Sequence, residues 1–315
     1  MDLSICIAAR NEMFLSRTIK DILEHSEVQT EVIVVYDGDW PDPPVEDHPR
    51  VHSIYHPVSV GQRAAINEAA RMSTAKYIMK ADAHCAFDQG FDVKLIENCE
   101  YNWTVVPRMY NLHVFDWQCK ICNHRTYQGP ELTECENCKK SNKFERVEVW
   151  KPRLSSRADF ARFDRDLHFQ YWRDYEKRPE SQGDIADLMC FVGACWFQHR
   201  ERFLELGGLD EEHGSWGQVG MEISAKSTLS GGRLVVNKTT WFSHLFRTRK
   251  GFMFPYSLSG NQVERARQYS KWLWIENNWS KAMHPLSWLV ERFWPIPGWE
   301  ENDLVNLKLM ERKLA

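Results

Sequence analysis

The feature that most constrains this chain is a regular alternation of strand and helix patterns over residues 1–95. Glu31–Tyr36 is a run of mainly β-branched residues, which is typical of a parallel strand buried on both faces. Further strands are predicted over 3–8, 51–55 and 77–80, and helices over 11–25 and 61–72. This alternation predicts an α/β fold with a mostly parallel sheet flanked by helices.

Polar side chains follow these strands where each one ends: Asp37, Asp39, Asp82 and His84. In parallel sheets the ligand lies beyond the carboxyl ends of the strands, so these residues predict a binding site. Asp82 and His84 can both turn toward one divalent ion, Mn²⁺ or Mg²⁺, which would neutralise charge on a leaving diphosphate. On these residues alone, a polar surface turn is the alternative interpretation.

Composition and charge narrow the class of protein. The net charge of −4 gives no global basic field of the kind that marks a nucleic-acid binder, although it leaves room for a local basic patch. No signal peptide and no membrane-spanning segment are predicted. Of nine cysteines, four form two close pairs and others stand singly in apolar segments, which favours a reducing cytoplasm.

Several ordered motifs resemble known families. Residues 4–12, 31–39 and 80–85 resemble the nucleotide-binding half of the family 2 glycosyltransferases, and Asp82-x-His84 followed by Cys85 is more similar to the polypeptide N-acetylgalactosaminyltransferases. Four later segments resemble landmarks of that second family: Gly207-Gly-Leu-Asp-Glu211, Trp216-Gly217, Glu222-Ile-Ser224 and Ser243-His-Leu-Phe-Arg247. Phe254-Pro-Tyr256 resembles the loop that follows. The resemblance covers residues 3–110 and 188–256 and implies a GT-A fold that transfers a sugar from a nucleotide sugar, UDP in these families, to an acceptor hydroxyl.

The resemblance also implies a site. Asp82, His84 and His244 would hold Mn²⁺ or Mg²⁺, and Asp37 would read the uracil ring. The donor site would further include Ala8, Arg10, Glu12, Asp39, Arg63, Trp216 and Arg247. In that set Arg63 is alternatively an ordinary helix residue and Trp216 a core aromatic, whereas the Arg247 guanidinium could offset diphosphate charge.

One position departs from the families. Inverting family 2 enzymes place an aspartate base in a Glu-Asp pair shortly before the equivalent of Glu222, and this chain has Val219-Gly220 there. Either the reaction retains configuration and needs no such base, or Asp210, Glu211 or Glu222 supplies it.

Cys119-x₂-Cys122 and Cys135-x₂-Cys138 form the strongest local motif. Two such pairs bring four thiolates into a tetrahedron suited to Zn²⁺, with no open position, so a structural zinc ribbon is predicted. The ribbon could grip an acceptor such as nucleic acid through nearby cations, or it could brace the fold. Acidic residues such as Glu131, Glu134 and Glu136 dilute the basic charge, and both interpretations stay open.

Four regions are expected: a nucleotide-sugar-binding half (1–116), the zinc-ribbon insertion (117–146), an acceptor-side half (147–259) and a helical C-terminal extension (260–315). The extension holds six of the fourteen tryptophans. We expect these to pack on the catalytic domain, with an oligomer interface as the second interpretation.

The functional hypotheses differ in which molecule accepts the sugar. A hydroxymethylated base in DNA is one candidate, and a protein, glycan or lipid-linked acceptor is the other. A third hypothesis is a non-catalytic zinc-ribbon binding module on an inactive GT-A fold.

Overall fold

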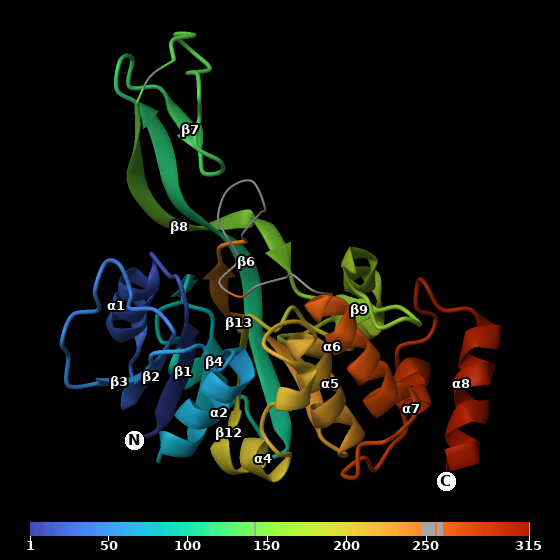
Figure 1. The fold of residues 1–315 in the computed structure, drawn as a ribbon. Coiled ribbons are helices and arrows are strands. Elements are labelled where there is room, and N and C mark those ends of the chain that lie inside the picture. The colour runs from blue at the N-terminus through green and yellow to red at the C-terminus, as the bar shows by residue number, and fades with distance from the viewer. Residues whose placement is uncertain (142, 247–255, 257–260, 315) are drawn as a thin grey trace.

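The computed structural model describes residues 1–141, 143–246, 256 and 261–314. Within that part of the chain, no helix is both long and apolar enough to cross a bilayer. The centre of the molecule is one large sheet (Figure 1). The order of its strands is β11 (Ile185–Asp187), β13 (Arg233–His244), β6 (Trp103–Cys119), β12 (Cys195–His199), β4 (Tyr77–Ala81), β1 (Leu3–Ala9), β2 (Thr30–Asp37) and β3 (Val51–His56).

The N-terminal half has the predicted alternation of strands and helices. Its strands are β1 (Leu3–Ala9), β2 (Thr30–Asp37), β3 (Val51–His56) and β4 (Tyr77–Ala81). Strand β1 pairs in parallel with both β2 and β4, and β2 pairs in parallel with β3. Helices α1 (Leu15–His25) and α2 (Gln62–Met72) connect them. The first helix starts four residues later than predicted, because Asn11 has a positive φ of 50° that a helix cannot accommodate.

The second half completes the sheet around a strand of opposite direction. Strand β12 (Cys195–His199) is antiparallel to β4 and to β6 (Trp103–Cys119), and β13 (Arg233–His244) runs parallel to β6. The sheet is extended by β5 (Cys85–Phe87) and β11 (Ile185–Asp187). Helices α3 (Phe91–Glu97), α4 (Arg200–Glu205) and α5 (Val219–Leu229) lie between these strands in the chain.

Successive residues of the central strands point to opposite faces, and each face has its own helices. Ile5 and Ile7 pack with Leu15 and Ile19 of α1. Cys6 belongs to a second cluster that contains the apolar side of α2, together with residues of α4 and α5. The strands are therefore buried on both faces, which explains why β2 is a continuous apolar run.

A long two-stranded arm rises from the upper edge of the sheet in Figure 1. It consists of the outer part of β6 and of β8 (Phe144–Ala158), with the short β7 (Arg125–Tyr127) also paired to β6. The boundaries expected at residues 116 and 147 fall inside β6 and β8, because the strands that carry the insertion continue into the domain.

The aromatic-rich segment after the arm folds against the domain. A small hairpin forms from β9 (Ala161–Phe163) and β10 (Phe169–Tyr171). Phe163, Trp172 and Tyr175 are buried in the same cluster as α5.

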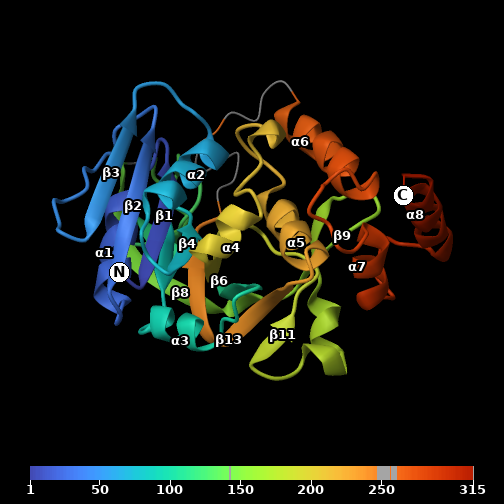
Figure 2. The same cartoon turned by 90° about the horizontal axis from the view of Figure 1, so that it is seen from below.

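The C-terminal extension is helical, as expected. It comprises α6 (Gln262–Ser270), a π-helical turn (Lys271–Ile275), α7 (Leu286–Arg292) and α8 (Glu301–Leu314). Figure 2 shows α7 and α8 at the end of the molecule farthest from β3. Five of the six tryptophans pack against the core: Trp274, Trp279, Trp288, Trp294 and Trp299. Trp272 is exposed, so packing accounts for most of these aromatic residues.

Candidate active site

Three candidate metal ligands meet at the carboxyl edge of the sheet. Asp82 and His84 follow β4 directly, and His244 is the last residue of β13. Strand β5 pairs with the end of β13 so that Cys85 lies opposite His244, which brings the two segments together. Ligand atoms of Asp82, His84 and His244 lie within 4.8 Å of one another, close enough to coordinate a single ion.

Lys80 belongs to the same site, although it was not among the site residues predicted from the sequence. Its side chain is buried, and its ammonium donates hydrogen bonds to Asp82 Oδ1 and to the carbonyl oxygens of Gly193 and Ala194. Burial by itself would raise the pKa of the Asp82 carboxyl, but Lys80 and then His244 hold that pKa well below its usual range. Asp82 is therefore ionised at neutral pH.

His244 presents a neutral imidazole, and His84 contacts a carboxylate. Burial lowers the pKa of His244 to about 4, so its ring is uncharged at neutral pH. Its Nε2 lies 3.1 Å from Asp82 Oδ2, and its buried Nδ1 has no hydrogen-bond partner among the described residues. His84 Nδ1 lies 3.3 Å from Glu12 Oε2, a carboxylate contact of the kind that orients metal-bound histidines.

One carboxylate and two imidazoles suit a divalent transition-metal ion. Mg²⁺ prefers oxygen ligands throughout, whereas the nitrogen donors of His84 and His244 favour a first-row transition metal such as Mn²⁺. His244 Nε2 lies 3.1 Å from Asp82 Oδ2, close enough for both atoms to contact one ion.

A cavity of about 340 Å³ opens beside these residues. Ala8, Glu12 and Trp216, all expected at the donor site, line it together with the three ligands. Much of the remaining wall is apolar, and it includes Phe163, Leu167, Phe169, Phe191, Val192 and Met221. The cavity therefore has a charged side next to β4 and an apolar side formed by residues 163–221.

Asp37 does not line this cavity, contrary to its expected role with uracil. Its carboxylate accepts hydrogen bonds from Ser59 Oγ and from the backbone N–H groups of Val60 and Gly61. It is fully buried and holds the loop that leads into α2. Arg10 donates to the Asp37 carbonyl oxygen and lies 4.0 Å from the half-exposed Asp39, and neither of the two residues lines the cavity.

Two predictions are wrong because Arg63 and Glu222 form a buried ion pair with each other. Arg63 Nε lies 3.0 Å from Glu222 Oε2, and both side chains are buried. Lys226 Nζ lies 2.8 Å from the other carboxylate oxygen, Oε1. Burial would raise the pKa of Glu222, but Lys226 and Arg63 bring it down to about 2. Arg63 is therefore not a donor-binding residue and Glu222 is not a base, because each is the other's buried partner.

Asp210 and Glu211 also lie away from the metal-ligand cluster. The Asp210 carboxylate accepts hydrogen bonds from the Glu212 N–H and the Tyr269 hydroxyl, and Glu211 accepts one from Asn67 Nδ2. Both line a separate surface depression rather than the cavity that contains Asp82. Neither can act as a base on a sugar bound beside Asp82, since a base must be within hydrogen-bond reach of the acceptor.

Close packing around Gly220 explains why no catalytic base stands at Val219-Gly220. Gly220 lies in the first turn of α5 directly against the carbonyl oxygen of Phe191, and a Cβ at this position would overlap that oxygen. Close packing therefore excludes any side chain, a carboxylate included. Among the described residues that line the cavity, the carboxylates are Glu12 and Asp82.

Some expected residues are outside the described part of the chain. Arg247, which was expected to offset diphosphate charge, is one of them, and Phe254 and Pro255 are others. Tyr256 is described, is buried and lines the cavity.

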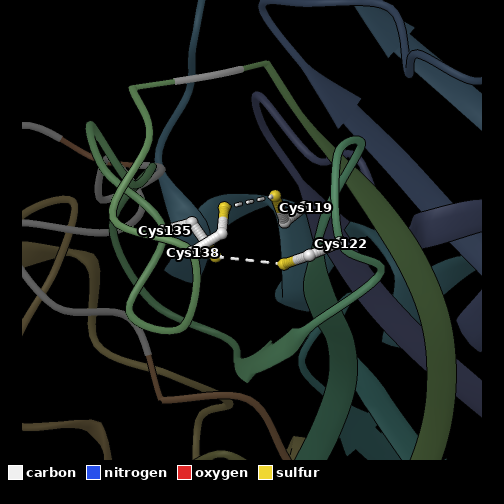
Figure 3. A group of neighbouring side chains, drawn as sticks. All are labelled: Cys119, Cys122, Cys135 and Cys138. Carbon is white, nitrogen blue, oxygen red and sulfur yellow. Dashed lines mark hydrogen bonds between the residues drawn. The ribbon is translucent and has the colours of Figure 1, made fainter.

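The four cysteines meet at the tip of the arm (Figure 3). Cys119 Sγ lies 3.8 Å from Cys138 Sγ, and Cys122 Sγ lies 3.6 Å from Cys135 Sγ. Zn–S bonds of about 2.3 Å give a tetrahedron with sulfur–sulfur edges of about 3.8 Å, so the four thiols fit a structural zinc ion.

Neither Lys80 nor the apolar side of the cavity was predicted from the sequence. Phe163 and Phe169 come from the small hairpin of β9 and β10, for which no prediction was made, and Phe191 follows a buried segment. A lysine in an otherwise apolar strand was the one available signal for Lys80.

Known proteins are similar to this chain in sequence and in fold. Residues 4–151 match the profile of the family described as Glycosyl transferase family 2. The putative polypeptide N-acetylgalactosaminyltransferase 13 of Drosophila melanogaster is 24% identical over 191 residues, which are 60% of this chain and 28% of that protein. Polypeptide N-acetylgalactosaminyltransferase 3 of Mus musculus is 25% identical over 281 residues, 84% of this chain and 40% of that protein.

A solved structure is similar over the whole chain. The crystal structure of GalNAc-T7 with UDP, GalNAc and Mn²⁺ superposes with a TM-score of 0.58 at 15% identity, covering 99% of this chain and 54% of GalNAc-T7. This chain thus spans less than half of the two curated relatives and about half of the solved one. It carries a glycosyl transferase family 2 domain in a GT-A fold and is a homologue of the polypeptide N-acetylgalactosaminyltransferases.

Proposed function

We propose that this protein is a metal-dependent glycosyltransferase that moves a sugar from a UDP-sugar to an acceptor hydroxyl. The observation that carries the proposal is the group of Asp82, His84 and His244 beside a cavity of about 340 Å³, in a family 2 domain. The UDP and Mn²⁺ bound by GalNAc-T7 support the same donor nucleotide and ion here.

Asp82, His84 and His244 would hold the ion. When bound, it supplies positive charge to the departing diphosphate. Glu12, in contact with His84 Nδ1, would fix the imidazole so that Nε2 is available as the ligand atom. Lys80 keeps Asp82 ionised and donates a hydrogen bond to its Oδ1, so Oδ2 would be the oxygen available to the ion. Trp216 and the apolar wall would exclude water from the sugar.

We further propose that the reaction retains the anomeric configuration. Three candidate bases, Asp210, Glu211 and Glu222, are held elsewhere by other contacts, and Gly220 cannot be replaced by a carboxylate. The carboxylates Glu12 and Asp82 both contact histidines of the ligand set. This distribution supports a mechanism that needs no dedicated protein base on the acceptor.

For the acceptor we propose a hydroxymethylated base in DNA. A protein, glycan or lipid-linked acceptor is the second candidate, which the names of the polypeptide-modifying relatives favour. The third possibility, an inactive GT-A fold that serves as a binding module, predicts metal-dependent UDP binding without turnover.

Mass spectrometry after incubation with a panel of UDP-sugars and Mn²⁺ tests these alternatives. The acceptor panel should include hydroxymethylated DNA, unmodified DNA, peptides and oligosaccharides. A sugar-sized mass increase on one acceptor class identifies it, and proton NMR of that product gives its anomeric configuration. UDP binding by calorimetry with no transfer and no hydrolysis would instead support the inactive module.

A further inference from the structure

The arm formed by β6 and β8 projects beyond the catalytic domain (Figure 1). Two features stiffen it. The ladder between β6 and β8 runs from Met109↔Ala158 to Cys119↔Phe144, and the four-cysteine cluster closes the tip. The arm is therefore a preformed surface, and a partner would bind it without first ordering it.

The arm is basic although the chain is acidic. Residues 109–158 contain nine Lys and Arg against six acidic residues, Asp116 and five Glu, while the whole chain has a net charge of −4. Asp116 lies 2.8 Å from His113 Nε2. Three of the five glutamates are within ion-pair distance of other side chains, as in Lys120–Glu145, Arg17–Glu148 and His124–Glu136.

Most of the arm's cations lack such a partner. Within the described residues, seven of them form no ion pair with a carboxylate: Arg125, Lys139, Lys140, Lys143, Arg146, Lys151 and Arg153. Among the described acidic residues of the arm, Glu131 and Glu134 likewise form no ion pair. Unpaired cations on a rigid surface attract a polyanion.

One face of the arm combines cations with aromatic rings. Lys151 lies opposite His113 and Arg153 opposite Asn111 across the ladder, so Lys151 and Arg153, two residues apart, project from the same face. The Arg153 guanidinium lies 4.6 Å from the ring centre of the exposed Tyr127, and the His113 ring lies 4.6 Å from that of Tyr127. Basic and stacking groups side by side suit sugar-phosphate backbones and bases.

The base of the arm adjoins the apolar side of the cavity. Met109 and Ala158, at the foot of β6 and β8, line a small recess together with Phe169 and Phe191. Phe169 and Phe191 also line the main cavity beside the metal ligands. A chain lying along the arm would therefore reach the cavity at its aromatic wall, where a planar base can stack.

We infer that the face of the arm carrying Tyr127, Lys151 and Arg153 is a DNA-binding surface that guides the acceptor strand to the cavity. This inference rests on the proposed function, because it assigns DNA as the acceptor of the transferase. The phosphates lie against the unpaired cations, and the modified base enters the apolar side of the cavity.

The test is fluorescence anisotropy of a short labelled DNA duplex with the full-length protein at several salt concentrations. Each lost phosphate contact reduces the slope of log K against log salt by about 0.9, so K151S/R153S should lower the slope by about 1.8. The matched control is K20S/K76S, which removes two exposed lysines from outside the arm and should bind like the wild type. Tyr127→Ala should weaken binding with little change in slope, because it removes stacking and no charge.

UDP-sugar hydrolysis without acceptor separates this inference from the proposed function. K151S/R153S should hydrolyse the donor at the wild-type rate and lose transfer to hydroxymethylated DNA. The inference is overturned if the wild type does not bind DNA at low salt, or if both double variants bind equally. It is also overturned if a peptide or glycan accepts the sugar while DNA does not, an outcome that leaves the transferase itself intact. If the wild type does not hydrolyse the UDP-sugar at all, that result would instead contradict the proposed function.

Discussion

The buried Lys80 forms an ion pair with the partly buried Asp82 at the end of β4, so one of the three proposed metal ligands is already neutralised by a lysine. The ammonium is further held by the carbonyl oxygens of Gly193 and Ala194 and cannot turn away. A bound ion would therefore experience a fixed positive charge nearby. This arrangement implies weak metal binding by the free protein and tighter binding when a diphosphate adds negative charge.

Lys80→Met tests that implication. The variant keeps the length of the side chain and removes its charge, so Mn²⁺ should bind the nucleotide-free protein about tenfold more tightly, or by about 1.4 kcal/mol. Isothermal titration calorimetry measures this directly. Lys76→Met, an exposed position just before β4, should leave Mn²⁺ affinity unchanged. Weaker Mn²⁺ binding by Lys80→Met would show that Lys80 mainly positions Asp82.

The buried His213 should make the free energy of unfolding depend on pH. Burial lowers its pKa from 6.5 to about 4, so the folded protein keeps it neutral at pH values where the unfolded chain takes up a proton. Its contribution is complete above pH 6.5 and is lost as the pH falls from 6.5 toward 4, by about 3 kcal/mol in total.

Urea unfolding at several pH values measures this contribution. His213→Gln should flatten the free energy of unfolding between pH 6.5 and 4. His52→Gln, at a partly exposed position on β3, should keep the wild-type slope. An equal slope in the wild type and His213→Gln would contradict the assignment.

Close packing at Gly220 should leave no room for a side chain. A methyl group there meets the Phe191 carbonyl oxygen, so Gly220→Ala should lower the free energy of unfolding by about 1–3 kcal/mol. Chemical denaturation gives the value. An unchanged unfolding midpoint would mean that the first turn of α5 can move, and that a carboxylate at 220 is sterically possible after all.

The cysteine cluster predicts one structural zinc ion per chain. Cys122→Ser with Cys135→Ser should abolish zinc by elemental analysis and expose the arm to protease, because thiolate ligands hold the metal and the metal holds the tip. Cys99→Ser, outside the cluster, should retain zinc. Full zinc content in the double variant would contradict the site.

The sheet and the proposed ligands could be predicted because their signals are local. The β-branched run of β2 and the polar residues after β4 stand within a few positions of one another. His244 was identified through a resemblance that depends on the order of motifs.

The roles of Arg63 and Glu222 could not be predicted, because they depend on a contact between residues 159 positions apart. An arginine in a helix has the same sequence pattern whether it points at a ligand or at a buried carboxylate. Asp37 illustrates the same limit, since its carboxylate is engaged by Ser59 and by backbone groups of a loop that has no sequence signature.

UDP-sugar turnover by wild type and Asp82→Ala, with and without Mn²⁺, tests most directly whether Asp82 holds a catalytic metal ion. We expect Mn²⁺-dependent release of UDP by the wild type and none by Asp82→Ala, whose circular dichroism spectrum should stay that of a folded protein. Mn²⁺-dependent turnover at the wild-type rate in Asp82→Ala would show that Asp82 is not a metal ligand required for turnover.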